Sequence, residues 1–119
     1  MTSPRVTIQP QDFDLSAEAA RLRADDGGVG AVVAFVGTVR ELSSGAAVSR
    51  MELEHYPGMT EAAIGEILSQ ALTRWPLVDA LVIHRFGTLL PGDPIMMVAT
   101  ASPHRVAAFE AAGIPVRVV

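Results

Sequence analysis

The four residues Ser102-Pro103-His104-Arg105 carry the clearest chemical signal in this sequence. Ser-Pro is a common helix start, with serine as N-cap and proline at the first helical position, so His104 and Arg105 are expected in the first turn. Cationic side chains there oppose the helix dipole, whereas the free N–H groups of that turn favour an anion. The pattern predicts a phosphate or carboxylate site; the alternative is that both side chains bend into solvent or pair with a nearby acid.

Arg40 is a second candidate anion ligand, because it closes a long apolar stretch and precedes a loop that contains Gly and Ser. An arginine at a strand end can reach into a cleft, and its guanidinium group matches phosphate or carboxylate oxygens. Taken alone, a solvated strand end is the more common situation. Arg40, His104 and Arg105 would form one site only if the fold brings them together, which sequence spacing does not establish.

Other polar residues that could do chemistry have simpler explanations. His55 shares an expected strand face with Met51 and Leu53, which favours a hydrogen-bonded core histidine. Glu52 and Glu54 lie on the opposite, exposed face, where a solvated or interfacial role is favoured over acid–base catalysis. With three histidines, no cysteine and no carboxylates at ligand spacing, no metal site is expected.

The composition is typical of a soluble globular protein. Half of the 119 residues are apolar, 18% are charged, and the formal net charge is −4, which argues against nucleic-acid binding. The chain has no cysteine, and its nine Lys+Arg residues are all arginines, so it contains no lysine. The N-terminal residues lack a signal-peptide pattern, and no apolar stretch is long enough to span a membrane. A soluble protein in the cytoplasm is therefore expected.

Hydrophobic periodicity predicts the elements that must position these residues. Strands are expected at residues 6–8, 30–40, 48–56, 80–86 and 95–101, with residues 41–47 as a loop and 91–93 as a turn. The stretch 30–40 is almost uninterruptedly apolar, which predicts a strand buried on both faces, and Gly37 within it marks a bulge or a close approach.

Three helices are expected, two between these strands and one after the last of them. Ser16 is the expected cap of a helix over residues 17–23, and Thr60 that of a helix ending before Pro76. The last helix should run from Pro103 to about Ala112, where the following Gly and Pro end it and residues 116–119 continue extended. Strands and helices mix without strict βαβ alternation, which predicts an α+β fold in a single domain over residues 1–119. The apolar stripe of the second helix consists of Ile64, Ile67, Leu68, Ala71 and Leu72.

Several blocks of the sequence occur in an order and spacing that resemble one known family. The most specific is the nine-residue run Leu53–Glu61 (Leu-Glu-His-Tyr-Pro-Gly-Met-Thr-Glu). This run and the six further blocks given next resemble the large (catalytic) subunit of molybdopterin synthase. The resemblance extends from Gly30 to Ala111, about two-thirds of this chain. The remaining blocks are Phe35–Arg40, Arg74–Pro76, Ile83–Arg85, Pro91–Asp93, Ser102–Arg105 and Ala108–Ala111.

The resemblance implies an α/β-hammerhead fold and a defined reaction. Members of this family form a homodimer within a heterotetramer, in which each large subunit binds a small ubiquitin-like sulfur-carrier subunit. The Gly-Gly thiocarboxylate of the carrier enters a pocket, and its sulfur is transferred in two rounds to cyclic pyranopterin monophosphate. The product is the dithiolene of molybdopterin. No cofactor, nucleic acid or membrane is implied.

By the same resemblance, five residues are substrate-binding positions: Thr38, Val39, Arg40, His104 and Arg105. The two arginines would hold the substrate phosphate, in agreement with the independent argument from the helix dipole. Many members of the family have lysine at the position of Thr38, so threonine removes one positive charge from the expected pocket.

The sequence departs from the family pattern after Ala111, where the family continues to two lysines thought to act in catalysis. Arg117 is no substitute, because its guanidinium group stays protonated and cannot act as an amine nucleophile or proton acceptor. No residue here is therefore assigned as catalytic. A frameshifted or truncated reading frame is the favoured explanation; the others are a non-catalytic paralogue that keeps dimer and carrier docking, or catalysis by other residues.

Overall fold

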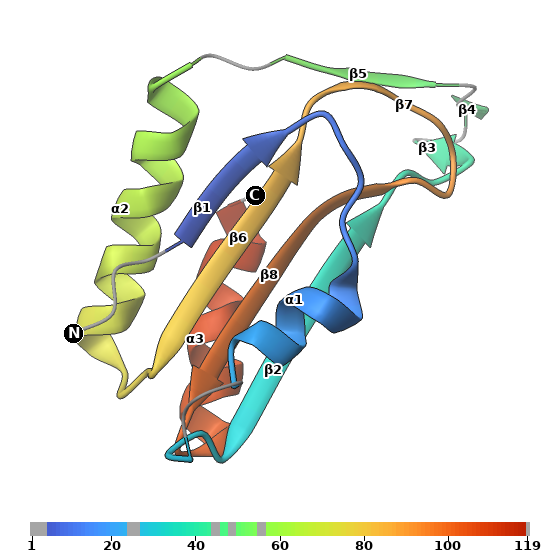
Figure 1. The fold of residues 1–119 in the computed structure, drawn as a ribbon. Coiled ribbons are helices and arrows are strands. Elements are labelled where there is room, and N and C mark those ends of the chain that lie inside the picture. Colours follow the sequence, from blue (N-terminus) through green and yellow to red (C-terminus); the bar gives the residue numbers. More distant parts are fainter. Residues whose placement is uncertain (1–4, 24–26, 44–45, 48–49, 55–56, 119) are drawn as a thin grey trace.

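The central feature of the molecule is a four-stranded sheet in the order β1-β6-β8-β2. The computed structural model describes residues 5–23, 27–43, 46–47, 50–54 and 57–118 (Figure 1). Within the sheet, β1 pairs in parallel with β6, and the two other pairings are antiparallel. The strands are β1 (Arg5–Gln9), β6 (Asp79–Arg85), β8 (Pro94–Ser102) and β2 (Ala31–Thr38).

Helices cover both faces of this sheet. The short α1 (Leu15–Arg21) crosses the front face in Figure 1, whereas α2 (Met59–Arg74) and α3 (Arg105–Val118) pack on the opposite face. The covering helices explain why β6 and β8 are nearly continuous apolar runs: both of their faces are buried.

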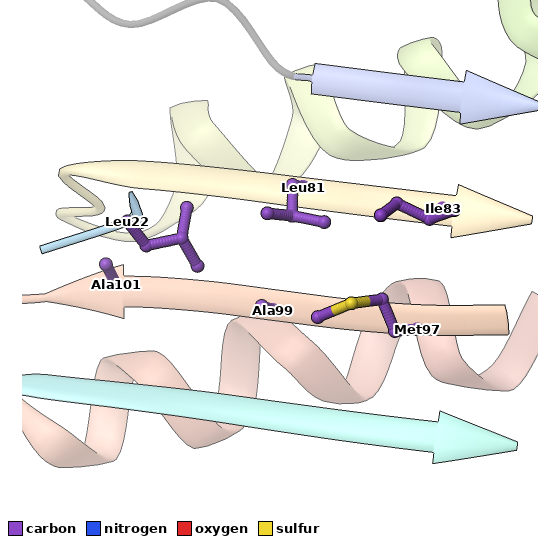
Figure 2. Close-up of a cluster of buried hydrophobic side chains, with 6 residues drawn as sticks. All are labelled: Leu22, Leu81, Ile83, Met97, Ala99 and Ala101. Carbon is purple, nitrogen blue, oxygen red and sulfur yellow. The ribbon is translucent and has the colours of Figure 1, made fainter. Parts of the chain in front are cut away.

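Alternate residues of β6 and β8 point into two separate core layers, as the period of two for a strand requires. Figure 2 shows the layer on the α1 side, where Leu22 packs on the sheet. On the other side, Ile64 and Leu68 of α2 cover Val82 and Val98 of the sheet. The side chains of the first layer are Leu22, Leu81, Ile83, Met97, Ala99 and Ala101.

A small lobe extends from the end of the sheet where β2 finishes. It contains two pairs of short antiparallel strands, and its β5 leads through residues 57–58 into α2 (Figure 1). These strands are β3 (Leu42–Ser43), β4 (Ala46–Ala47), β5 (Met51–Leu53) and β7 (Gly87–Leu89).

Most predicted elements are confirmed, and with them the α+β class. The apolar stripe of α2 is correct: Ile64, Leu68 and Ala71 are buried, and the helix ends at Arg74, just before Pro76. The turn at residues 91–93 is confirmed, as is the irregularity at Gly37, where the register with β8 shifts. Among the described residues, no helix is both long and apolar enough to cross a lipid bilayer.

Two predicted helix caps are wrong by two residues. The cap of α1 is Asp14, whose carboxylate accepts the Ala17 N–H at 3.0 Å; a carboxylate caps as well as the hydroxyl of Ser16 would. The second helix begins after Gly58, whose N–H donates to Glu61 Oε2 at 2.6 Å, so Thr60 is not its cap. Both helices therefore begin earlier than the pattern indicates.

The predicted strand over residues 30–40 is shorter than expected and is not buried on both faces. Among the described residues β2 pairs only with β8, so it is an edge strand, and Phe35 in its middle is 43% exposed. The expected loop at residues 41–47 contains the β3–β4 pair, and β7 was missed because three residues are too few to show a period. The prediction for residues 48–56 is confirmed for β5; His55 lies outside the described residues.

The last helix begins and ends later than predicted. It starts at Arg105, so Pro103 is not its first residue, and it continues through Gly113 and Pro115 to Val118. A helix-interior glycine or proline costs about 1 or 3 kcal/mol, respectively. Pro115 lacks the backbone N–H for one hydrogen bond within the helix. Burial of Ala108 and Ala111 holds the helix on the sheet despite this loss. Tertiary packing therefore overrides the local stop signal.

Candidate substrate-binding site

Ser102 fixes the corner at which β8 turns into α3. Its side chain is fully buried; its hydroxyl donates to Pro76 O at 2.9 Å and accepts the His104 N–H at 3.0 Å. Its carbonyl oxygen accepts the N–H of Gly30 at 2.9 Å. These three bonds tie the start of α3 to the chain before β2 and to the chain after α2.

His104 and Arg105 project from this corner, and both are exposed. The His104 carbonyl oxygen accepts the N–H of Ala108 at 3.1 Å, which places His104 at the cap position and Arg105 in the first turn of a 14-residue helix. The helix begins two residues later than predicted, so His104 and Arg105 each lie two positions closer to its N-terminus than expected. A histidine and an arginine side chain therefore stand where backbone N–H groups favour an anion.

Arg40 follows a second corner with its own backbone anchor. Val39 donates its N–H to Asp93 O at 3.0 Å and accepts the Gly92 N–H at 2.8 Å, so the turn at residues 91–93 holds it from both sides. The Val39 side chain is only 3% exposed, whereas Thr38 and Arg40 on either side of it are exposed. Val39 can thus position its neighbours rather than contact a ligand with its side chain.

One chain does not bring the two corners together. In the antiparallel pairing of β2 with β8, Ala31 lies opposite Ser102 and Thr38 lies opposite Pro94, so the corners are at opposite ends of β2 (Figure 1). Seven strand positions at about 3.3 Å each separate them by about 23 Å. The predicted residues form two exposed cationic sites within a single chain, one at each end of the edge strand.

A cavity of about 200 Å³ lies elsewhere, on the α1 side of β1 and β6. Its two arginines are both engaged: Arg5 is paired with Asp79, and Arg21 with Glu18 at 2.8 Å. None of the residues predicted to bind substrate lines it. The lining residues are Arg5, Thr7, Gln9, Glu18, Arg21, Leu81, Val82 and Ile83.

Comparison with known proteins identifies the family. The family model described as "MoaE protein" matches residues 8–116, which include both cationic corners. The chain belongs to the MoaE family. It is 56% identical over 108 residues to a protein named molybdopterin synthase catalytic subunit from Ralstonia nicotianae, covering 91% of this chain and 61% of that protein. The chain thus spans about three-fifths of that relative's length.

Solved structures of MoaE proteins share the fold. The Burkholderia ambifaria protein superposes with a TM-score of 0.87 at 50% identity, over 95% of this chain and 74% of that one. The molybdopterin synthase structure from Staphylococcus aureus gives 0.83 at 27% identity, over 98% and 82%. The resemblance and fold class predicted from the sequence are confirmed.

Sequence reasoning missed two contributors to the corners of this MoaE protein. Gly30 was expected only as the first residue of a strand, yet a Cβ atom there would lie 2.3 Å from Pro103 O, so only glycine lets the chain before β2 pass this close to the Ser102 corner. Arg85 donates to backbone carbonyl groups on two different segments. Neither contact has a local signal in the sequence, because each joins segments far apart in the chain.

Proposed function

We propose that this MoaE protein takes part in molybdenum cofactor biosynthesis as the catalytic subunit of molybdopterin synthase. The observation that carries the proposal is the family match over residues 8–116, in which exposed arginines occupy two corners with rigid backbone anchors. Relatives that carry this enzyme name at 56% identity support the same assignment. The reaction is sulfur transfer from a thiocarboxylated small carrier subunit to cyclic pyranopterin monophosphate.

In this proposal the two corners bind the substrate, and no residue of the chain is assigned a catalytic role in sulfur transfer. The guanidinium groups of Arg40 and Arg105 bind phosphate oxygens, because a planar fork of donors matches them. His104 adds a further donor beside the start of α3, and Thr38 lines the site without adding charge. The carrier supplies its Gly-Gly thiocarboxylate to the same pocket.

A homodimer built on β2 would complete the site. If the free edges of β2 from two copies pair in antiparallel fashion about a two-fold axis, the Thr38 end of one strand lies beside the Ala31 end of the other. Ser102 lies opposite Ala31 on β8, the neighbouring strand, about 4.8 Å away. Arg40 of one copy would therefore approach His104 and Arg105 of the second. Two equivalent sites would form, each with residues from both copies.

Exposed apolar side chains at this edge support the dimer. Phe35 on β2 is 43% exposed, and Val106 and Phe109 on α3, which packs against β2, are 64% and 65% exposed. Exposed apolar surface of this kind is typical of protein–protein contact sites.

We expect Phe35→Glu to dissociate the homodimer. A two-fold dimer contains the substitution twice. Because Phe35 is 43% exposed, burial of the exposed part contributes about 0.6–1.3 kcal/mol in each copy, so the dimer dissociation constant should rise at least about tenfold. Sedimentation velocity at micromolar protein measures this. Met59→Glu is the control, because Met59 is 74% exposed at the start of α2, a helix that packs against β1 and β6, away from the β2 edge of the sheet. A monomeric unmodified chain would contradict the proposed dimer.

We expect Arg40→Ala and Arg105→Ala each to weaken binding of cyclic pyranopterin monophosphate by about 1.5–3 kcal/mol, the range for hydrogen bonds to charged groups. Titration calorimetry on the purified chain measures the affinity. Arg21→Ala removes an exposed arginine of α1 that pairs with Glu18, and it should leave the affinity unchanged. Unchanged binding in both corner variants would remove these residues from the site and the phosphate role from the proposal.

The absence of lysine favours a second candidate function. A chain without an amine side chain could keep the dimer and the carrier-docking surface as a non-catalytic binding module. The two candidates share substrate and carrier binding and differ in turnover, which molybdopterin formation by the unmodified chain measures.

A further inference from the structure

Arg85, at the end of β6, joins two segments that are distant in sequence. Its Nε and Nη2 donate to Pro10 O at 3.1 and 2.9 Å, and its Nη1 donates to Pro94 O at 3.0 Å. The residue is half-buried, and one planar guanidinium group thus satisfies a carbonyl beyond β1 and another at the start of β8. The fork geometry matters, because the donors point in fixed and different directions.

The start of β8 is also the anchor of the Arg40 corner. Pro94 lies opposite Thr38 in the β2–β8 pairing, at the register shift, and the preceding residue Asp93 accepts the Val39 N–H through its carbonyl oxygen. Asp93 in turn holds its own turn together: its carboxylate Oδ2 accepts the Leu90 N–H at 2.8 Å, and its N–H donates to Leu90 O at 2.9 Å.

Two hydrogen bonds, joined by the backbone between Asp93 and Pro94, therefore connect Arg85 to the residue before Arg40. The guanidinium holds Pro94, the adjacent Asp93 holds Val39, and Arg40 leaves the sheet directly after Val39. Arg40 itself lies beyond the end of β2, where the ladder no longer restrains it. Arg85 and Asp93 hold the turn in place, and the turn sets the backbone position from which the Arg40 side chain extends.

We propose that Arg85 is a positioning residue for the Arg40 corner: it fixes the turn at residues 91–94 and thereby the place of the Arg40 guanidinium in the substrate site. This inference rests on the proposed function for the role of Arg40 and on hydrogen bonds alone for the positioning. Arg85 acts through Pro94 and Val39, and does not itself touch substrate.

Amide hydrogen exchange on Arg85→Lys tests the positioning directly. Lysine keeps the charge but replaces three separate donor nitrogens by one ammonium group and so loses the fork that joins Pro10 to Pro94. Local opening should therefore speed exchange of the Val39 and Gly92 N–H groups about tenfold. Exchange of the Gly30 and Val78 N–H groups, bonded to Ser102 O and Ala101 O at the opposite end of the sheet, should not change.

Two results would overturn the positioning role. One is unchanged exchange at Val39 and Gly92 in Arg85→Lys. The other is equal acceleration at all four amides, which would mean that Arg85 stabilises the whole fold. Arg5→Lys serves as the matched control: Arg5 joins β1 to β6 at their other end through Asp79, and its replacement should leave the Val39 and Gly92 amides unchanged.

Substrate affinity tests the connection to the site. Arg85→Lys should weaken binding of cyclic pyranopterin monophosphate about five- to tenfold in calorimetry, whereas Arg5→Lys should not. Faster exchange at Val39 with unchanged affinity would overturn the inference. Failure of the unmodified chain to bind the pyranopterin would instead contradict the proposed function, while the exchange data would still decide whether Arg85 holds the turn.

Discussion

The 119-residue chain, mixed with thiocarboxylated carrier and cyclic pyranopterin monophosphate, is expected to form little or no molybdopterin. An amine can hold the acyl end of the carrier or move protons during sulfur transfer, and this sequence contains no lysine. Its nine arginines remain protonated and cannot take that role. Positioned proton transfer typically contributes about 10²–10⁴-fold to a rate, which is the deficit we expect.

Turnover should return when the residues after Ala111 are replaced by a family-like segment that bears lysines. Ala108 and Ala111 are buried against the sheet, so the replacement would begin from an anchored part of α3. Molybdopterin formation over time is the measurement, and the same segment with arginine in place of each lysine is the control. If the unmodified chain matches the lysine-bearing version, the catalytic group is among the residues already present, with His104 the first to test.

Gly30→Ala is expected to destabilise the protein and to disturb the His104 corner. The added Cβ would lie 2.3 Å from Pro103 O and 3.1 Å from Pro103 C, and these are backbone atoms that cannot move aside as a flexible side chain would. Relief of the contact must displace β2 or the start of α3 and strain the Gly30–Ser102 hydrogen bond. We expect a loss of about 1–3 kcal/mol in the free energy of unfolding, measured by denaturant titration.

Gly27→Ala is the matched control for this experiment. Gly27 belongs to the same connection before β2, but among the residues that the structure describes none lies within 4 Å of a Cβ placed there. Alanine lowers the conformational entropy of the unfolded chain. The free energy of unfolding of this variant should therefore be unchanged or higher by up to about 1 kcal/mol. Equal stability of the two variants would mean that the close approach at Pro103 does not constrain the fold. Pyranopterin affinity should fall only in Gly30→Ala.

The elements with strong periodicity could be predicted from the sequence. The α2 stripe has its apolar residues at helical spacing, and β6 and β8 are apolar runs of strand length, so burial forces these structures. Caps and ends were less well predicted, because Asp14 and Ser16 are both good N-caps and only the fold selects between them. The continuation of α3 through Pro115 shows the same limit, since propensity is a local preference that packing can outweigh.

The candidate site was predictable in its residues and not in its geometry. The anion signal at His104 and Arg105 depends on a helix start, which is local in the sequence, and the structure places both at the start of α3. Their separation from Arg40 depends on strand order and direction, which no spacing along the chain encodes. The resemblance already implies a homodimer, and the position of the two corners at opposite ends of β2 gives that dimer a role in the proposed site.

By itself, the sequence determined the family, the α+β class, the identity of the cationic residues and the absence of any lysine, since motifs, hydrophobic period and composition are properties of the chain alone. The tertiary structure decided that β2 is an edge strand, that Gly30 must remain glycine, and that Arg85 holds the turn beside Arg40. Each of these depends on contacts between segments distant in sequence, and such contacts exist only after the sheet has assembled.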